Sequence, residues 1–206
     1  MTGDQRLESI LTIAERLFFE RGYRGVSMRD LAAAVGVQIS TLYYYFPSKE
    51  EILYRILKVY YEQLLEAAGG SIRDLPPGAT STARVQRLVT ESVLSLIAHW
   101  QAAGIAVAGA TSELPAEQRR ELNSFVERYE DLYLSVIHEG IDSGEFIKTD
   151  AAMAAYLMLG AQVRLCVWYR PEGRLTPEQI AGTFSFLLAR SLVANPEQLG
   201  GTSAAR

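Results

Sequence analysis

The stretch Ser40–Leu53, STLYYYFPSKEEIL, holds side chains suited to hydrogen bonding and charge rather than to bond making. It carries hydroxyl groups on three small residues, Ser40, Thr41 and Ser48, and on three consecutive tyrosines, and it also contains Lys49. Hydroxyls and an ammonium group suit contacts with phosphate oxygens and with the polar edges of bases. Successive residues of a helix point about 100° apart, so three tyrosines in a row cannot all be buried. Part of this run must therefore face outward.

Residues that usually carry catalysis or bind metals are sparse. His99 and His138 are the only histidines and lie far apart, and Cys166 is the only cysteine. No spacing matches a metal-binding pair such as His-x-x-x-His, and no glycine-rich phosphate loop occurs. The sequence therefore predicts no enzyme, no metal and no cofactor. A single cysteine also excludes a disulfide framework and favours the cytoplasm.

Composition and charge describe an ordinary globular chain. Of 206 residues, 49% are hydrophobic and 21% are charged, and the net charge is −4. This charge is uneven, because residues 1–60 hold eight Lys/Arg against seven Asp/Glu, whereas the remainder holds twelve against seventeen. The first segment can thus carry a local basic face. The N-terminal residues lack the pattern of a signal peptide.

The elements that position Ser40–Leu53 are predicted to be short helices. Apolar residues recur at helical spacing through Leu7–Phe18, and Gly22 follows as a stop. Ser27–Asp30 has the spacing of a capping box and begins a second helix, which Gly36 ends within about two turns. The next helix runs up to Pro47. Helix, glycine-containing turn and helix form the helix-turn-helix pattern.

The rest of the chain is predicted to be helical. Ser48 begins a long helix that Gly69-Gly70 should end, and a Gly/Pro/Ser/Thr-rich linker follows. We predict an all-α fold of about nine helices, with a three-helix DNA-binding type of domain over residues 1–47 and a second helical domain over 48–206. Within the second, 48–68 is the connecting helix and 198–206 a disordered tail. Further helices are expected at 82–100, 105–112, 115–143, 149–169 and 176–194.

Angles around the helix before Pro47 divide its residues into three sets. The inward set should pack on the core, and the outward set is small, small and aromatic, as a helix that enters a DNA groove requires. The flanking set could donate hydroxyls to phosphates. A surface aromatic patch, or packing against a neighbouring domain, is the alternative. The inward set is Ile39, Leu42 and Phe46, the outward set is Ser40, Thr41 and Tyr44, and the flanking set is Tyr43 and Tyr45.

Two basic residues are candidates for phosphate contacts. Lys49 lies in the first turn of the helix that Ser48 caps, where backbone N–H groups and the helix dipole favour an anion. Arg29 lies near the start of the first helix of the motif.

Residues 22–53, GYRGVSMRDLAAAVGVQISTLYYYFPSKEEIL, closely resemble the DNA-binding signature of the TetR family of transcriptional repressors. The resemblance implies an all-α homodimer that binds a double-stranded DNA operator through its N-terminal domain. It also implies a C-terminal domain that binds a small ligand and dimerises. Base contacts would come from the outward set, and phosphate contacts from the flanking set and Lys49. Matching positions are Gly22, Ser27, Leu31, Ala32, Gly36, Val37, Leu42, Tyr43, Phe46, Lys49 and Leu53.

Two departures from the family pattern stand at the start of the recognition helix. Gln38 occupies a position where a serine or threonine cap is common, and Ile39-Ser40 replaces a frequent pair of a charged residue and glycine. A weaker cap could cost about 1 kcal/mol of local helix stability.

The second domain offers candidates for a ligand pocket, although ordinary core packing explains each residue alone. Gly104 and Gly109 interrupt an apolar segment, and such a break can open a cavity between helices. Arg164 lies in an otherwise apolar stretch, so it should either form an internal ion pair, with Glu127, Glu130 or Asp131, or bind an anionic ligand. The candidates are Trp100, Phe125, Tyr129, Leu132, Tyr133, Met158, Gln162 and Arg164.

A local resemblance indicates the class of ligand. WYRPEGRLTPEQIA, residues 168–181, resembles the corresponding helix-loop-helix of TetR-family regulators of fatty-acid and sterol degradation, whose effectors are acyl-CoA thioesters. The resemblance implies an acyl-CoA or a related hydrophobic anion, with Arg164, Arg170 or Arg174 at its phosphates.

The last two helices are apolar over much of their circumference, so each needs two buried sides. A second copy of the chain can cover one side through a two-fold four-helix interface, and a fully internal helix is the alternative. Ala151–Tyr169 approaches the length of a membrane span, but it contains Arg164 and stands alone, so we expect no membrane insertion. The expected interface residues are Ala154, Ala161, Ile180, Phe184, Leu187 and Leu188.

Together these patterns predict a homodimeric repressor on a palindromic operator, released by a hydrophobic or acyl-CoA-type effector. We expect it in the cytoplasm, associated with the nucleoid. The alternative is a dimeric ligand-binding protein of the same fold that has lost specific operator binding.

Overall fold

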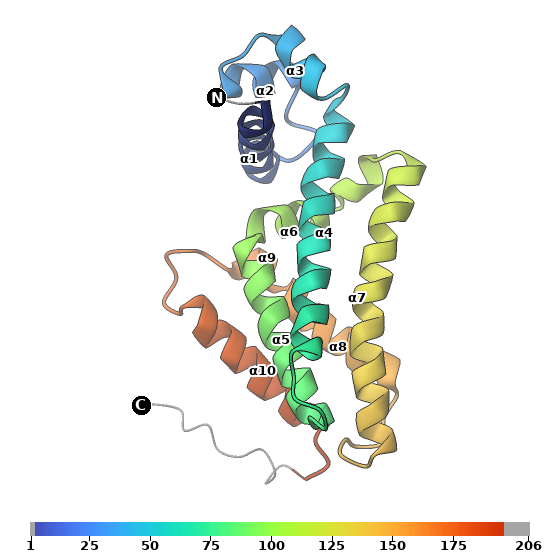
Figure 1. Ribbon diagram of the computed structural model, residues 1–206. Coiled ribbons are helices and arrows are strands. Elements are labelled where there is room, and N and C mark those ends of the chain that lie inside the picture. Colours follow the sequence, from blue (N-terminus) through green and yellow to red (C-terminus); the bar gives the residue numbers. More distant parts are fainter. Residues whose placement is uncertain (1–2, 196–206) are drawn as a thin grey trace.

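The computed structural model describes residues 3–195 and is all-α, as predicted (Figure 1). Within this range the one β-type contact is an isolated bridge between Phe146 and Val193. The expected disordered tail, 198–206, lies outside the described residues. The helices are α1 (Gly3–Arg21), α2 (Met28–Val35), α3 (Ile39–Tyr45), α4 (Lys49–Arg73), α5 (Ser81–Ala98), α6 (Trp100–Val107), the 3₁₀ helix η1 (Ala110–Glu113), α7 (Ala116–Asp142), α8 (Ala151–Val163), α9 (Leu165–Trp168) and α10 (Pro177–Leu192).

The N-terminal domain packs α1, α2 and α3 around the start of α4 (Figure 1). The predicted capping box forms, because the Asp30 N–H donates to Ser27 Oγ at 3.2 Å and the Ser27 N–H donates to Asp30 Oδ2 at 2.8 Å. Gly36 ends α2 in the left-handed region (φ 76°), which is open to glycine without strain. A sharp turn therefore leads from α2 into α3.

The long helix α4 links the two domains and does not end at Gly69-Gly70, so that prediction is wrong. It continues to Arg73. Gly69 is buried where α4 packs on α5 and α7, although a Cβ there would meet Leu132 of α7 at an ordinary contact distance of 3.9 Å. Tertiary packing has overridden the low helix propensity of two glycines.

The helix expected at 82–100 forms as α5, and the broken piece expected at 105–112 begins earlier and forms as α6 and η1. The single helix expected at 149–169 is divided at Arg164 into α8 and α9. Ala151–Trp168 is the one described stretch long and apolar enough to cross a membrane, with a mean hydropathy of 1.4. Because Arg164 divides it and α8 packs on α7, it is weak evidence for a span.

A second connection between the domains runs from α1 to α6 and η1. The Ala102 N–H, in the first turn of α6, donates to Glu15 Oε1 at 3.2 Å. The ring of Phe19 lies edge-on to Trp100, with centroids 4.5 Å apart, and covers Gly104, where a Cβ would approach Phe19 to 2.7 Å. Helix α6 has no side-chain cap of its own, so Glu15 supplies one from the other domain.

We expect Glu15 to lower the free energy of unfolding once its carboxyl group is ionised. Burial raises the pKa of Glu15, so the folded protein holds its proton more tightly than the unfolded chain does. Its contribution to the free energy of unfolding therefore falls as pH rises from about 4.3 through the raised pKa. Glu15→Gln keeps an acceptor for the Ala102 N–H without the charge. The free energy of unfolding of this variant should therefore equal or exceed that of the wild type at pH 7, and it should not fall as the pH rises.

Urea denaturation of wild type and both Glu15 variants at pH 4.5 and pH 7 measures this effect. Glu15→Ala is the matched control, because it removes both the charge and the cap and should lower stability at pH 7 by about 1 kcal/mol relative to Glu15→Gln. Equal stability of the two variants would contradict the capping role.

Candidate DNA interface and effector chamber

Helix α3 presents two small residues and a tyrosine outward. Tyr44 is 84% exposed and Tyr43 49% exposed, whereas Leu42 and Phe46 are buried, as the helix angles predict. Ser40 is exposed, and Thr41 and Tyr45 are half-buried. The Tyr45 ring supports Tyr44 edge-on, with centroids 5.4 Å apart. This arrangement leaves the outward set free for a groove.

The start of α3 differs from expectation at one residue. Ile39 was expected to be inward but is 38% exposed, because it is the first residue of a seven-residue helix and the core contacts come from the following turn. Gln38 makes no side-chain capping hydrogen bond, in agreement with its weak capping preference. The N-terminal end of α3 is held instead by backbone hydrogen bonds from the Thr41 and Leu42 N–H groups to the Gln38 carbonyl.

Lys49 has a structural role that sequence reasoning missed. Its Nζ donates to the backbone carbonyls of Tyr23 at 2.9 Å and Val26 at 2.8 Å, and it lies 4.1 Å above the ring of Tyr23. The Tyr23 hydroxyl donates to Glu50 at 3.1 Å, and burial together with this carboxylate raises the pKa of Tyr23. Lys49 therefore fixes the α1–α2 loop to the start of α4.

Lys49→Ala should weaken operator and random DNA alike and reduce the salt slope of binding by about 1, because one phosphate contact is lost. Thermal melting must accompany the titration, since the loop also loses two hydrogen bonds. Arg29, which is exposed on α2, provides the comparison: Arg29→Ala should change the slope without changing stability. An unchanged slope for folded Lys49→Ala would limit Lys49 to its structural role.

The C-terminal domain contains a chamber of about 190 Å³ between α4, α6, α7 and α8. Of the predicted ligand residues, Phe125 and Tyr129 line it. Tyr60 and Tyr61 of α4 also line it, although the sequence indicated only a connecting role for this helix. Their spacing in the connecting helix gave no signal, because adjacent tyrosines also suit ordinary packing.

A buried polar group supports one wall of the domain. Tyr133 donates to Gln162 Oε1 at 3.1 Å, and Gln162 Nε2 donates to the Met158 carbonyl at 3.1 Å. All three residues are buried, and Tyr129 lies 3.4 Å from both Tyr133 and Gln162. These candidates therefore form a hydrogen-bonded layer next to Tyr129, whereas the chamber lining comes from other residues.

The remaining ligand candidates lie elsewhere. Leu132 lines a separate groove between α4 and α7, and Trp100 lies between Phe19 and Tyr169. Arg164 is exposed where α8 ends, and it makes no ion pair with any described residue, so the expected internal pair is wrong. The break between α8 and α9 brings its side chain to the surface, where solvent hydrates the charge.

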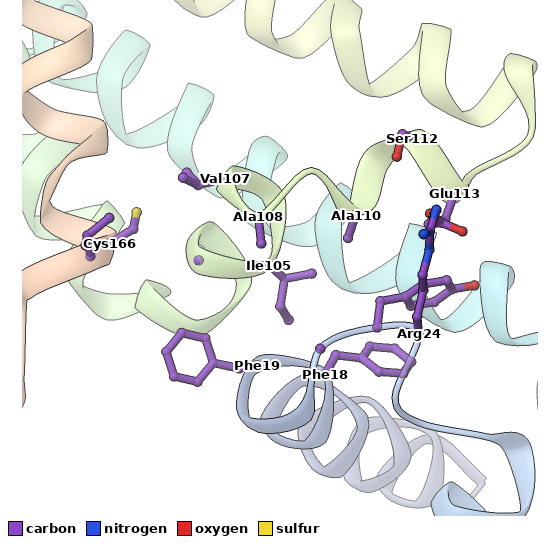
Figure 2. Close-up of a pocket in the computed structure, with 14 residues that line it drawn as sticks. Phe18, Phe19, Arg24, Ile105, Val107, Ala108, Ala110, Ser112, Glu113 and Cys166 are labelled. Atoms are coloured by element: carbon purple, nitrogen blue, oxygen red, sulfur yellow. Dashed lines mark hydrogen bonds and ion pairs between the residues drawn. The ribbon is translucent and has the colours of Figure 1, made fainter.

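An open groove of about 710 Å³ separates α1 from α6 and η1 (Figure 2). Phe18 and Phe19 line one side, and Ile105 and Val107 the other. Arg24 and Glu113 close one end as an ion pair with a 2.6 Å separation (Figure 2). Val107 lines both this groove and the chamber, so α6 lies between the chamber and the DNA-binding domain.

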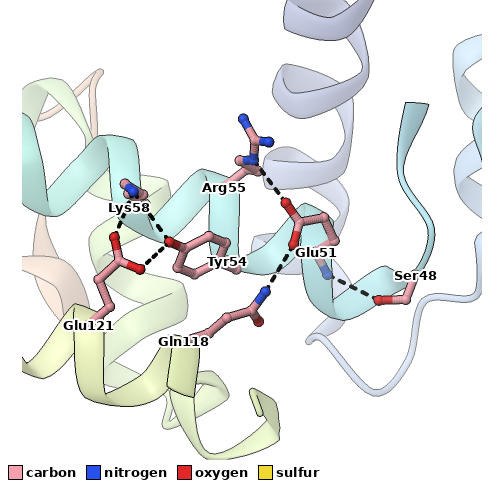
Figure 3. A network of polar contacts seen from close by, with 7 residues as sticks. All are labelled: Ser48, Glu51, Tyr54, Arg55, Lys58, Gln118 and Glu121. Atoms are coloured by element: carbon pink, nitrogen blue, oxygen red, sulfur yellow. Dashed lines mark hydrogen bonds and ion pairs between the residues drawn. The ribbon is translucent and has the colours of Figure 1, made fainter. Parts of the chain in front are cut away.

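A polar network joins α4 to α7 just below the DNA-binding domain (Figure 3). Tyr54 and Lys58 both donate to Glu121 at 2.6 Å, and these two hydrogen bonds lower the pKa of that carboxyl group. Gln118 of α7 donates to Glu51 at 2.9 Å. Movement of α7 would therefore be transmitted to the first turns of α4.

An apolar face lies exposed on α8 and α10. Met153, Tyr156 and Leu157 of α8 are 56–66% exposed, and Leu187 of α10 is 56% exposed. Ala161, Phe184 and Leu188 are half-buried. Ala154 and Ile180, which were expected at the interface, are buried in their own chain, so that part of the prediction is wrong. Both helices are apolar over much of their circumference, so the pattern alone could not fix which side faces inward.

The fold and this outward helix define a class, a helix-turn-helix transcriptional regulator rather than an enzyme. Residues 10–56 match the family described as bacterial regulatory proteins, tetR family, and residues 78–192 match the tetracyclin repressor-like C-terminal domain. The chain belongs to the TetR family.

Similar proteins share this architecture. The HTH-type transcriptional repressor KstR2 of Rhodococcus jostii (strain RHA1) is 28% identical over 191 residues, 92% of each chain. The crystal structure of PfmR from Thermus thermophilus has 28% identity and a TM-score of 0.80, and the match covers 88% of this chain and 97% of that one. AibR, solved in complex with isovaleryl coenzyme A and operator DNA, has 26% identity and a TM-score of 0.77 with the same coverage.

Proposed function

We propose that the chain is a ligand-responsive repressor that acts as a homodimer on a palindromic operator. The observation that carries this proposal is the exposed outward set of α3, in which Ser40 and Thr41 leave room for close approach and Tyr44 projects beyond them. A helix that reads base edges in the major groove requires this shape. Relatives named as repressors support the direction of control.

Dimerisation would follow from the exposed apolar face of α8 and α10. Met153, Leu157 and Leu187 lie on this face, and so many exposed large apolar side chains on adjacent helices favour a protein interface. A two-fold axis would set two copies of α3 about 34 to 36 Å apart, one helical turn of DNA. The operator would then be palindromic.

Release would follow when an effector in the chamber moves α6 and α4. Ala103, Ala106 and Val107 of α6 line the chamber, and Glu15 of α1 caps the same helix. Displacement of α6 would therefore move the DNA-binding domain through α1 as well as through α4. The effector must bind more tightly to the dimer whose two α3 helices do not match the spacing of the half-sites. An effector with equal affinity for both states of the dimer would not shift the equilibrium between them.

An acyl-CoA-type effector is the class we favour. The similar protein AibR, whose complex holds isovaleryl coenzyme A, supports this choice, as does the apolar chamber. We expect the protein in the cytoplasm, associated with the nucleoid.

Fluorescence anisotropy with DNA from upstream of the coding region tests the proposal. We expect a sequence-specific, salt-sensitive complex at nanomolar to micromolar protein, which a CoA thioester dissociates. Thioester binding without any specific DNA complex would instead favour a ligand-binding protein that has lost operator recognition.

A further inference from the structure

The chamber is small, and its size limits what it can hold. A volume of about 190 Å³ corresponds to roughly six times the 30 Å³ that one water occupies in the liquid. Pockets for drug-sized ligands begin at about 300 Å³. The chamber is open on one side, so it encloses about a handful of carbon atoms while the rest of an effector extends out of it.

The lining is apolar apart from a few polar side chains. Leu64, Phe125, Val126 and Leu159 supply much of the apolar surface. Glu130 is the single carboxylate residue that lines the chamber, and no lysine, arginine or histidine lines it. A free carboxylate inside would therefore lack a cationic partner and would face another carboxylate, which is costly away from water.

Two tyrosine hydroxyls in the chamber are available to a ligand. Neither Tyr60 nor Tyr61 makes a side-chain hydrogen bond with any residue that the structure describes, although Tyr60 is buried and Tyr61 half-buried. Burial raises the pKa of both phenols, so both remain protonated donors across the physiological range. The hydroxyl of Tyr129 lies 3.4 Å from the Tyr133 hydroxyl and 3.4 Å from Gln162 Oε1, and the Ser92 side chain also interacts with it. Both hydroxyl oxygens of Tyr60 and Tyr61 keep some contact with solvent, so a ligand acceptor would take the place of water there.

We infer that the chamber binds a short or branched acyl group of about four to six carbons, whose neutral carbonyl oxygen accepts hydrogen bonds from Tyr60 and Tyr61. This inference rests on the proposed effector-binding function and names its ligand as a neutral thioester or ester in place of a free acid. A long acyl chain would leave most of its apolar surface outside the chamber, in contact with water. The remainder of the molecule lies outside the chamber.

Calorimetry with the full-length protein and no DNA tests the size limit and the neutral carbonyl. The probes are butyryl-, isovaleryl-, octanoyl- and palmitoyl-CoA, with CoA alone and isovaleric acid as controls. We expect isovaleryl- or butyryl-CoA to bind at least tenfold more tightly than palmitoyl-CoA, and neither control to bind comparably. Tighter binding of palmitoyl-CoA, equal binding of the free acid, or no binding of any thioester would overturn the inference.

Single-atom removals test the donors. Tyr60→Phe and Tyr61→Phe should each weaken the preferred thioester roughly three- to tenfold, the worth of one hydrogen bond. Tyr54→Phe is the matched control, because Tyr54 lies on the same helix, does not line the chamber and donates to Glu121. Equal effects of all three substitutions would contradict a direct contact with the ligand.

Variants that change the volume of the chamber should change the preferred length of the acyl chain, a result that partial unfolding does not produce. Leu159→Ala enlarges the chamber and should shift the preferred acyl chain toward octanoyl-CoA, while Ala106→Leu fills it and should weaken every thioester. An unchanged chain preference in Leu159→Ala would place the acyl group elsewhere. Because these titrations contain no DNA, their outcome is separate from that of the operator assay.

Discussion

Tyr44→Ala is expected to lower operator affinity roughly ten- to a hundredfold while it leaves binding to random DNA almost unchanged. Tyr44 is 84% exposed and makes its one ring contact with Tyr45, so its removal should not affect folding. A side chain that reads base edges contributes to discrimination, whereas phosphate contacts act on all sequences alike. Anisotropy titrations with operator and random duplexes at one salt concentration measure the ratio of the two affinities.

Tyr43→Phe is the control for Tyr44→Ala. Tyr43 is 49% exposed on the flank of α3, and loss of its hydroxyl should weaken both duplexes to a similar degree. If Tyr44→Ala also lost affinity equally on operator and random DNA, the division between base and phosphate contacts would be wrong.

Leu157→Asp is expected to convert the dimer into a folded monomer and to lower operator affinity roughly a hundredfold or more, because two half-sites can no longer be bound together. Leu157 is 64% exposed in the described chain, so the monomer fold should tolerate the change. A buried aspartate at the interface would have no cationic partner. Light scattering after size exclusion, with thermal melting, measures mass and folding.

Val59→Asp provides the matched control for Leu157→Asp. Val59 is 44% exposed on α4, away from the apolar face of α8 and α10, so this variant should remain dimeric. A dimeric Leu157→Asp protein with full operator affinity would show that the two chains meet through another surface.

The DNA-binding domain could be predicted from sequence because its signals are local. The Ser27–Asp30 capping box, Gly36 and the inward pair of Leu42 and Phe46 are set by neighbouring residues. Lys49 was less predictable, since its two carbonyl partners belong to a loop that only the folded chain brings near. Local patterns therefore fixed the helices but not the contacts between them.

The C-terminal domain was predicted less completely for a physical reason. Helix α8 is apolar on every side, so nothing in its pattern distinguished buried Ala154 from exposed Leu157. The end of α4 depended on its packing against α5 and α7, and the position of Arg164 depended on a break between α8 and α9. Tyr60 and Tyr61 entered the chamber through tertiary packing that no spacing along α4 indicates.

The measurement that most directly tests the central claim is a DNase footprint on DNA from upstream of the coding region, with and without isovaleryl-CoA. We predict two protected half-sites with centres about 10 to 10.5 base pairs apart, or a multiple of this, related by a palindrome. Protection should fall as the thioester is added and should be absent with Tyr44→Ala at the same protein concentration. Protection of a single site without symmetry, or none at micromolar protein, would contradict a dimeric repressor that reads DNA through α3.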